Sequence, residues 1–255
     1  MSDVAIYRYP GIVTDHSPTF LTAEWRHLAM FNYEIDPKLL NALVPYGTDL
    51  DQWSGRTFVS LVGFRFLRTR VLGIMFPFHC NFSEVNLRFY VCRREGTATK
   101  RGVAFVREIV PRRIIASVAS ALYGERYVAL PMSHRIQSEG QNIVVEYGWE
   151  LGNSKNTMKL TTNGSPALPT EDSVEQFISE HYWGYASPRG GGTIEYEVRH
   201  PQWKVWQASN AIFTGSMKGL YGAELGAVLE RVPDSAFLAE GSAVSVHRGE
   251  RLTDV

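Results

Sequence analysis

The chain has 255 residues, of which 44% are hydrophobic and 20% are charged. A chain of this length and apolar content can bury a large core, which excludes wholesale disorder. Basic and acidic residues number 26 each, so the formal net charge is +0 and no long-range field attracts nucleic acid or an anionic membrane. We therefore expect neither of these as a partner.

The expected compartment is the cytoplasm. The N-terminus lacks the apolar stretch of a secretory signal, and no apolar run is long enough to cross a bilayer. The spacing of Cys80 and Cys92 fits neither a redox motif nor a zinc motif, which predicts two unpaired thiols. The histidines lack metal-ligand spacing, and we expect neither a metal nor a cofactor.

The first predicted elements are an arm and a strand. Residues 1–20 are polar and rich in turn residues, which predicts an N-terminal arm. The remainder, 21–255, has no linker or internal repeat and is predicted to form one domain. Residues 21–33 are typical of a strand. A short helix is predicted over 36–43, with Asp36 as its N-cap.

Strands are predicted through most of the segment between residues 56 and 113. The clearest is 84–92, where apolar residues occupy one face. The opposite face carries polar side chains at alternate positions: Glu84, Asn86, Arg88 and Tyr90. A second strand is predicted over 102–110, and a helix over 113–123.

The second half of the chain again alternates strands with short helices. In chain order the predictions are a hairpin over 134–148, strands over 149–161, a loop over 163–169, a helix capped by Ser173, a strand over 193–200, a helix over 220–229 and a strand over 243–248. Many β segments with few short helices predict a mainly β domain, either closed or sandwiched.

Three segments resemble the acetoacetate decarboxylases in the same order. Arg26 precedes the 36–43 helix as that family's substrate-carboxylate arginine does, and Phe82-Ser83-Glu84 is similar to an aromatic-x-Glu whose glutamate lines the cavity. Residues 107–113, Arg-Glu-Ile-Val-Pro-Arg-Arg, resemble the family's Arg-Glu…Pro-Lys-Lys segment. The Schiff-base lysine falls at Arg112, whose guanidinium stays protonated and cannot form an imine. Schiff-base decarboxylation is therefore not expected.

A likeness to the uncharacterised DUF2071 (YqjF-like) family, of the same superfamily, spans residues 21–248. It is carried by Asp36-Pro37…Leu43-Val44-Pro45, by Phe82 to Arg88, by Ser173…Phe177…Glu180-His181-Tyr182, and by Val198-Arg199-His200-Pro201-Gln202-Trp203. The resemblance implies an acetoacetate decarboxylase-like fold, a cone-shaped, closed double β-barrel with a central cavity, and no established reaction. The superfamily often assembles as rings or dimers, which implies a homo-oligomer by analogy.

The candidate ligand-binding residues are mainly arginines. Arg26, Arg107 and Arg112 could converge near the cavity mouth and hold a small organic acid, because a guanidinium binds a carboxylate through two parallel hydrogen bonds. The alternative is that Arg107 pairs with a strand neighbour and Arg112 faces water. Arg88 and His200 are further candidates, and for His200 the alternative is a local hydrogen bond.

Glu84 is the candidate catalytic residue. If its strand face lines the cavity, the carboxyl is partly removed from water and could act as a general acid or base. The alternative is a structural pair with Arg88, on the same side of the strand. Three hypotheses follow: a receptor for a small organic acid, a lyase or hydrolase that uses Glu84 on a keto acid or ester, and an interaction module whose cavity is filled by its own aromatic residues.

Overall fold

The computed structural model describes residues 17–113, 115, 126–140, 142–188 and 190–252. Most of the predicted arm and most of the predicted 113–123 helix therefore lie outside the described residues. The named helices are η1 (Pro37–Leu39), α2 (Val174–Ser179) and α3 (Lys218–Leu229). In the described part of the chain, no helix has the length and apolar character required to cross a membrane.

The other elements are strands. In the first half they are β1 (Thr19–Glu34), β2 (Asp49–Leu50), β3 (Phe58–Val71), β4 (Phe82–Glu95), β5 (Ala98–Val110), β6 (Tyr127–Ala129) and β7 (Met132–Glu139). In the second half they are β8 (Asn142–Leu151), β9 (Ser154–Ala167), β10 (Trp183–Ala186), β11 (Thr193–Arg199), β12 (Val205–Thr214), β13 (Ser235–His247) and β14 (Glu250–Leu252).

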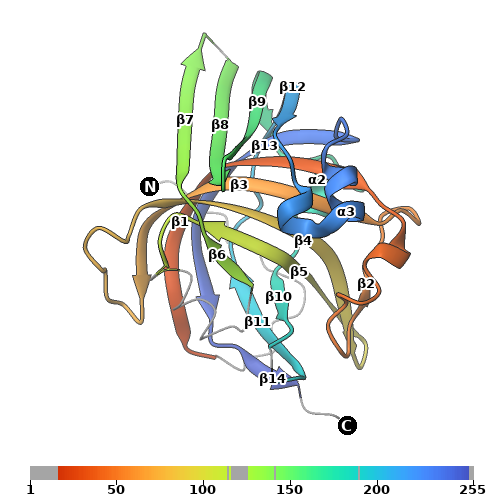
Figure 1. Cartoon of the computed structure of the whole chain (residues 1–255). Coiled ribbons are helices and arrows are strands. Elements are labelled where there is room, and N and C mark those ends of the chain that lie inside the picture. The colour runs from red at the N-terminus through yellow and green to blue at the C-terminus, as the bar shows by residue number, and fades with distance from the viewer. Residues whose placement is uncertain (1–16, 114, 116–125, 141, 189, 253–255) are drawn as a thin grey trace, which may run out of the picture.

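Seven of these strands close into a barrel. Hydrogen-bonded neighbours run β11–β10–β5–β4–β3–β1–β13, and β13 pairs again with β11, at Val198↔Val246 and Arg199↔Ser245. The β10–β5 pair is parallel and the other six pairs are antiparallel. Beyond β13 the sheet continues through β12, β9, β8 and β7, and Figure 1 shows β7 and β8 extending away from the barrel. The predicted fold class, mainly β with a closed barrel, is confirmed.

The alternation of β4 places its two faces in two different cores. Val85, Leu87 and Phe89 belong to a cluster outside the barrel, which packs against α3 and the β7–β9 extension. Tyr90 belongs to the other cluster, inside the barrel. Because successive side chains of a strand point to opposite faces, the predicted polar face of β4 points inward. Both faces are covered, and residues 82–91 are all buried.

Among the irregularities of the barrel strands, two change which of the candidate site residues point inward. In β1 the register shifts between Arg26 and Ala29 in its pairing with β3, and His27 has a φ of 54°. In the β4–β5 pair the register shifts between Leu87 and Arg88. Such a bulge adds one residue to one strand, so the inward and outward positions exchange beyond it.

Several sequence predictions need correction. The helix predicted over 36–43 is reduced to one 3₁₀ turn, although Asp36 caps it as expected, by accepting a hydrogen bond from the Lys38 amide at 2.9 Å. The loop predicted over 163–169 is wrong in its first part, because β9 continues to Ala167. Strand β12 was not predicted. Most of its residues are exposed or half-buried, so its sequence lacks the apolar alternation that marks a strand with one buried face.

Candidate functional site

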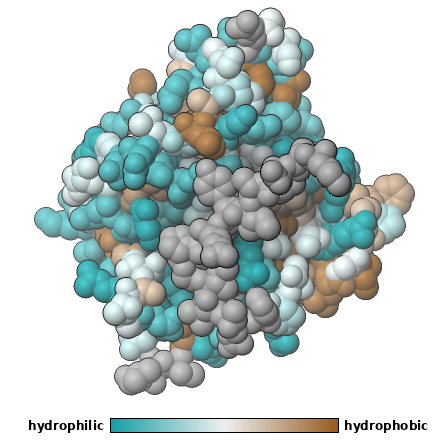
Figure 2. All heavy atoms as spheres, turned by 180° about the vertical axis from the view of Figure 1, so that it is seen from behind, coloured by the Kyte–Doolittle hydropathy of each residue, from teal (hydrophilic) through white to brown (hydrophobic). Residues whose placement is uncertain are grey.

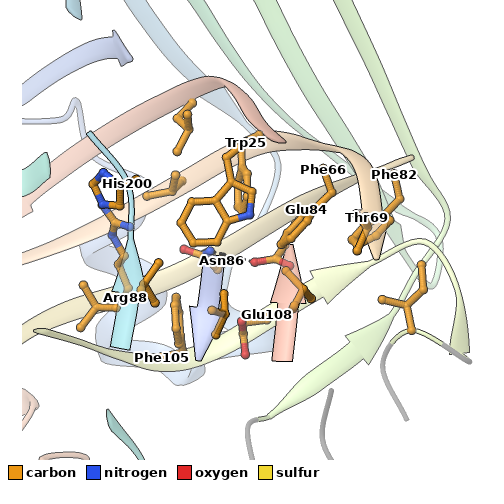
Figure 3. Close-up of a pocket in the computed structure, with 18 of the residues that line it drawn as sticks. Trp25, Phe66, Thr69, Phe82, Glu84, Asn86, Arg88, Phe105, Glu108 and His200 are labelled. Atoms are coloured by element: carbon orange, nitrogen blue, oxygen red, sulfur yellow. Dashed lines mark hydrogen bonds between the residues drawn. The ribbon is translucent and has the colours of Figure 1, made fainter. Parts of the chain in front are cut away.

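The inside of the barrel holds a cavity of about 520 Å³ (Figure 3). Its wall is mainly apolar and rich in aromatic rings, among them Trp25, Phe64, Phe66, Phe82, Phe105 and Trp203. Stacked and edge-on contacts order these rings; Phe66 and Phe82, for example, stack with centroids 4.7 Å apart. A few polar side chains interrupt this wall, which is the usual composition of a small-molecule site.

One polar group on the wall consists of Glu84, Asn86 and Glu108. Glu84 and Asn86 come from β4, and Glu108 lies opposite Asn86 on β5. The Asn86 Nδ2 donates a hydrogen bond to Glu84 Oε1 at 3.0 Å. All three are buried and line the cavity, and Figure 3 shows the Glu84 carboxyl near Asn86, with Glu108 below them. The site thus contains two buried carboxyl groups, of which that of Glu84 accepts a hydrogen bond from the Asn86 amide.

Arg88 is the one arginine among the described residues that line the cavity. It is 9% exposed, and its Nη2 donates to the carbonyl of Ile178, at the end of α2, at 3.2 Å. Its Nε is buried without a hydrogen-bond partner in the described part of the protein. A buried cation is unfavourable unless it is paired, so this guanidinium retains an unused capacity to bind an anion.

His200 lies next to Arg88 at the same end of the cavity (Figure 3). Its ring stacks on Trp203 with centroids 4.1 Å apart, and its Nδ1 lies 2.9 Å from the carbonyl of Pro201. Since a carbonyl only accepts, the proton of the neutral ring sits on Nδ1 and Nε2 is the acceptor. Burial lowers the pKa of His200 to about 4, and the charge of Arg88 lowers it too, while the Pro201 carbonyl opposes the shift. His200 is therefore neutral at pH 7.

A second buried histidine, His181, also lines the cavity. Its Nε2 lies 3.0 Å from Asp51 Oδ2, which also accepts a 2.7 Å hydrogen bond from Arg101 Nε. Burial lowers the pKa of His181 to about 4, against the opposing hydrogen bond to Asp51. Burial alone would raise the pKa of Asp51, but its bonds with His181 and Arg101 outweigh this and lower it. The dyad holds the imidazole in one orientation.

The structure does not bring Arg26, Arg107 and Arg112 together in the cavity, and none of them lines it. Arg26 binds Glu24 Oε2 through Nε and Nη2 at 3.1 and 3.0 Å, and donates to the Gly241 carbonyl. Arg112 is exposed and donates to the carbonyl of Phe78. The predicted convergence is corrected accordingly: of the candidate residues, Glu84, Arg88 and His200 line the cavity.

The bulges explain where two of the arginines point. In β1, Ala23 lies in the inner cluster before the bulge, and Leu28 and Met30 lie in it after. Arg26 precedes the bulge and lies three positions after Ala23. Because successive side chains alternate between the faces of a strand, Arg26 points outward where Ala23 points inward. In β5, the bulge similarly turns Arg107 outward and Glu108 inward.

Sequence reasoning missed Glu108 and His181. Both stand in segments that carry the family resemblance, Arg107-Glu108 and Glu180-His181-Tyr182, and this was the available signal. Periodicity could not place Glu108 because of the bulge, and the partner of His181, Asp51, is distant in the sequence. Within the described residues, no group of three or more His, Cys, Asp or Glu side chains is placed to hold a metal ion.

Solved structures with a similar fold come from the acetoacetate decarboxylase group. The enduracididine biosynthesis enzyme MppR, complexed with pyruvate, superimposes with a TM-score of 0.67 at 14% identity, over 95% of this chain and 93% of that one. The acetoacetate decarboxylase of Legionella pneumophila superimposes with a TM-score of 0.62 at 12% identity, over 98% of this chain and 94% of that one. At these identities the likeness shows the fold, which is acetoacetate decarboxylase-like.

The sequence comparisons identify the family. The uncharacterized protein YqjF of Bacillus subtilis (strain 168) is 25% identical over 207 residues, which is 79% of this chain and 81% of YqjF. The profile of DUF2071, described as "Uncharacterized conserved protein", matches residues 22–243 and so covers all seven strands of the barrel except the first residues of β1 and the last residues of β13. The chain belongs to the DUF2071 family.

Proposed function

We propose that this protein binds a small organic acid with a largely apolar body inside the barrel. The observation that carries the proposal is the buried guanidinium of Arg88, whose Nε has no hydrogen-bond partner in the described structure. Arg88 lies in the wall of a mainly apolar cavity that is rich in aromatic rings. A carboxylate would take two parallel hydrogen bonds from the guanidinium and would neutralise its charge, an arrangement that is stronger beside an apolar wall than in bulk water.

The rest of the cavity defines the other end of the ligand. About 520 Å³ is enough for a small metabolite or a molecule the size of a drug. Aromatic rings such as Trp25, Phe64 and Phe105 leave few polar partners for the ligand's body. The ligand class that fits is therefore a monocarboxylate with an apolar or aromatic body. The structurally similar enzyme MppR was solved in complex with pyruvate, a small carboxylic acid, and supports this class by analogy.

A thermal-shift series tests the proposal. A panel of monocarboxylates of increasing apolar size, each beside its uncharged amide, is added to the wild-type protein and to two variants. We expect at least one acid, and not its amide, to raise the melting temperature, because a ligand that binds only the folded state stabilises it. Arg88→Met should abolish this rise. Arg26→Met is the matched control, since Arg26 lies outside the cavity against Glu24, and it should retain the rise.

The reverse pattern contradicts the proposal: stabilisation that survives Arg88→Met, or amides that stabilise as well as their acids. No stabilisation by any acid, together with a cavity that excludes small apolar probes such as xenon, would favour the interaction-module hypothesis.

A second candidate function, a lyase or hydrolase that uses Glu84 as general acid or base, is favoured by the Glu84–Asn86–Glu108 group. Two carboxyl groups in one cavity wall offer side chains for both roles, a general acid and a general base. In screens with keto acids and esters, Glu84→Gln should abolish turnover and keep the acid-dependent thermal shift. Equal turnover in Glu84→Gln and wild type would exclude this role.

A further inference from the structure

The loop between β3 and β4, residues 72–81, exposes several large apolar side chains. Five of them are exposed: Leu72 by 68%, Ile74 by 59%, Met75 by 40%, Phe76 by 53% and Phe78 by 84%. Isolated apolar residues on a surface are ordinary, but five in one seven-residue stretch form a continuous patch. In Figure 1 this loop projects from the left side of the molecule, and Figure 2, seen from behind, shows the patch at the right edge.

The backbone of the loop holds these side chains outward. Leu72 and Phe78 have φ values of 50° and 65°, in the left-handed region that bulky residues rarely adopt. Two hydrogen bonds between Val71 and Ile74, each 3.0 Å long, close a tight turn around Leu72 and Gly73. A mere connection between two strands requires neither the apolar side chains nor the unfavourable φ values.

Arginines flank the patch on both sides. Arg70 is exposed at the end of β3. Arg112 is exposed and donates a hydrogen bond to the Phe78 carbonyl, inside the loop itself, and exposed Arg113 follows it. In the part of the protein that the structure describes, none of these three makes an ion pair. The loop sequence, Leu72 to Asn81, has no acidic residue. The patch is therefore apolar at its tip and positively charged at its edges.

We propose that the β3–β4 loop is the site at which this protein contacts an anionic phospholipid surface. Aromatic and aliphatic side chains on the tip enter the boundary between headgroups and acyl chains, while the arginines at the edges meet the phosphate and carboxylate groups of the headgroups. The +0 net charge of the whole chain does not oppose this contact, because charge attraction at an interface acts within a Debye length, about 10 Å. Charge complementarity selects this partner over a second copy, because two such loops facing each other would bring arginines against arginines.

The same loop forms part of the cavity wall. Phe76, Pro77 and His79 line the cavity, and Phe76 is also 53% exposed, so the cavity reaches the surface at the loop. The proposed contact would thus place the cavity opening at the membrane. The link to an apolar acid ligand rests on the proposed function above, but the membrane contact itself does not require it.

Vesicle flotation tests the proposal. The full-length protein is mixed with vesicles of phosphatidylcholine alone, or with about a third of phosphatidylserine, at low and high salt. Wild type should float with the anionic vesicles, and Phe78→Ser should reduce the partition coefficient at least tenfold. Arg70→Gln and Arg112→Gln should each reduce it roughly fivefold and weaken its salt dependence. Val232→Ser is the matched control, since Val232 is also 84% exposed and lies in another part of the chain, and it should bind as wild type does.

Each remaining outcome overturns the proposal. These outcomes are no flotation with any vesicle, equal flotation of Phe78→Ser and wild type, equal binding to neutral and anionic vesicles, and self-association that Phe78→Ser abolishes in a protein that does not bind vesicles. Circular dichroism melts confirm that each variant is folded. The Arg88-dependent thermal shift is measured on the same samples, so failure of the membrane contact and failure of the cavity proposal are distinguished.

Discussion

Arg88 and His200 lie side by side at one end of the cavity, and the positive charge of the arginine contributes to keeping the histidine neutral. Burial is the larger cause of the lowered His200 pKa, and both effects oppose protonation of the ring. A neutral imidazole beside a fixed guanidinium leaves the anion-binding capacity of this end to Arg88 alone. The pairing also makes the stability of the fold depend on pH.

The first prediction concerns that pH dependence. The pKa of His200 is about 4 in the folded protein and 6.5 in the unfolded chain, so the unfolded chain binds more protons below pH 6.5. The contribution of the neutral His200 ring to the unfolding free energy is fully present above pH 6.5, and it decreases as the pH falls toward 4. Acidification from pH 7 to pH 5 should therefore lower the unfolding free energy by about 2 kcal/mol through His200 alone. Urea unfolding of wild type and His200→Gln at both pH values measures the difference.

The expected result is a loss on acidification that is about 2 kcal/mol smaller in His200→Gln than in wild type. His181, with a pKa of about 4, remains in both proteins and cancels in the comparison. Equal losses in the two proteins would contradict the buried, neutral state of His200.

The second prediction concerns Asp51, which accepts hydrogen bonds from both His181 and Arg101. Asp51→Asn removes the charge that both donors face and should lower the unfolding free energy by about 2 kcal/mol, the range of a hydrogen bond to a charged group. The pKa of His181 should fall further, because its bond to Asp51 is what opposes the effect of burial. Denaturant unfolding and NMR titration of the ring measure the two effects. Asp49→Asn, an exposed carboxylate on the same short strand, should change neither.

Much of the fold was predictable because its signals are local. The alternation of 84–92 separated the two faces of β4 correctly, with Glu84, Asn86 and Arg88 on one side, and the structure places that side in the cavity wall. The capping pattern at Ser173 was also correct, and its Oγ accepts a hydrogen bond from the Gln176 amide at 3.2 Å. Periodicity and caps are properties of neighbouring residues, and tertiary contacts need not be known.

The parts of the site that failed depend on non-local geometry. Arg26 was expected in the cavity. The bulge that follows it exchanges the inward and outward positions of β1, and nothing in the local sequence marks where the bulge lies. Arg107 and Glu108 exchange places for the same reason in β5. The partner of His181 is Asp51, 130 positions earlier in the chain, and that pairing required knowledge of the barrel.

The third prediction tests how the barrel closes. The parallel pair β5–β10 pairs Gly102 with Trp183 and Val103 with Gly184. A Cβ on Gly102 would lie 2.6 Å from the Trp183 carbonyl and 2.6 Å from the Tyr185 ring, so the two strands would have to separate. Gly102→Ala should therefore cost about 2 kcal/mol of unfolding free energy, as expected for overpacking. Gly190→Ala is the control, because its Cβ would meet only the Arg251 guanidinium at 3.8 Å. Similar urea midpoints for the two variants would show that the strands tolerate separation.

The fourth prediction concerns the chemistry that the resemblance to the decarboxylases suggests. A Schiff base requires a lysine amine within the cavity, but among the described cavity-lining residues there is none, and Arg112 lies outside with its guanidinium on the Phe78 carbonyl. Incubation with acetoacetate and borohydride should leave the intact mass of the protein unchanged, because borohydride traps only an imine and arginine does not form one. A lysine-dependent acetoacetate decarboxylase, treated in parallel, should gain the mass of the reduced adduct. A stable mass increase in this protein, located on one lysine by peptide mapping, would show that an amine does reach the ligand and that the role assigned to Arg88 is incomplete.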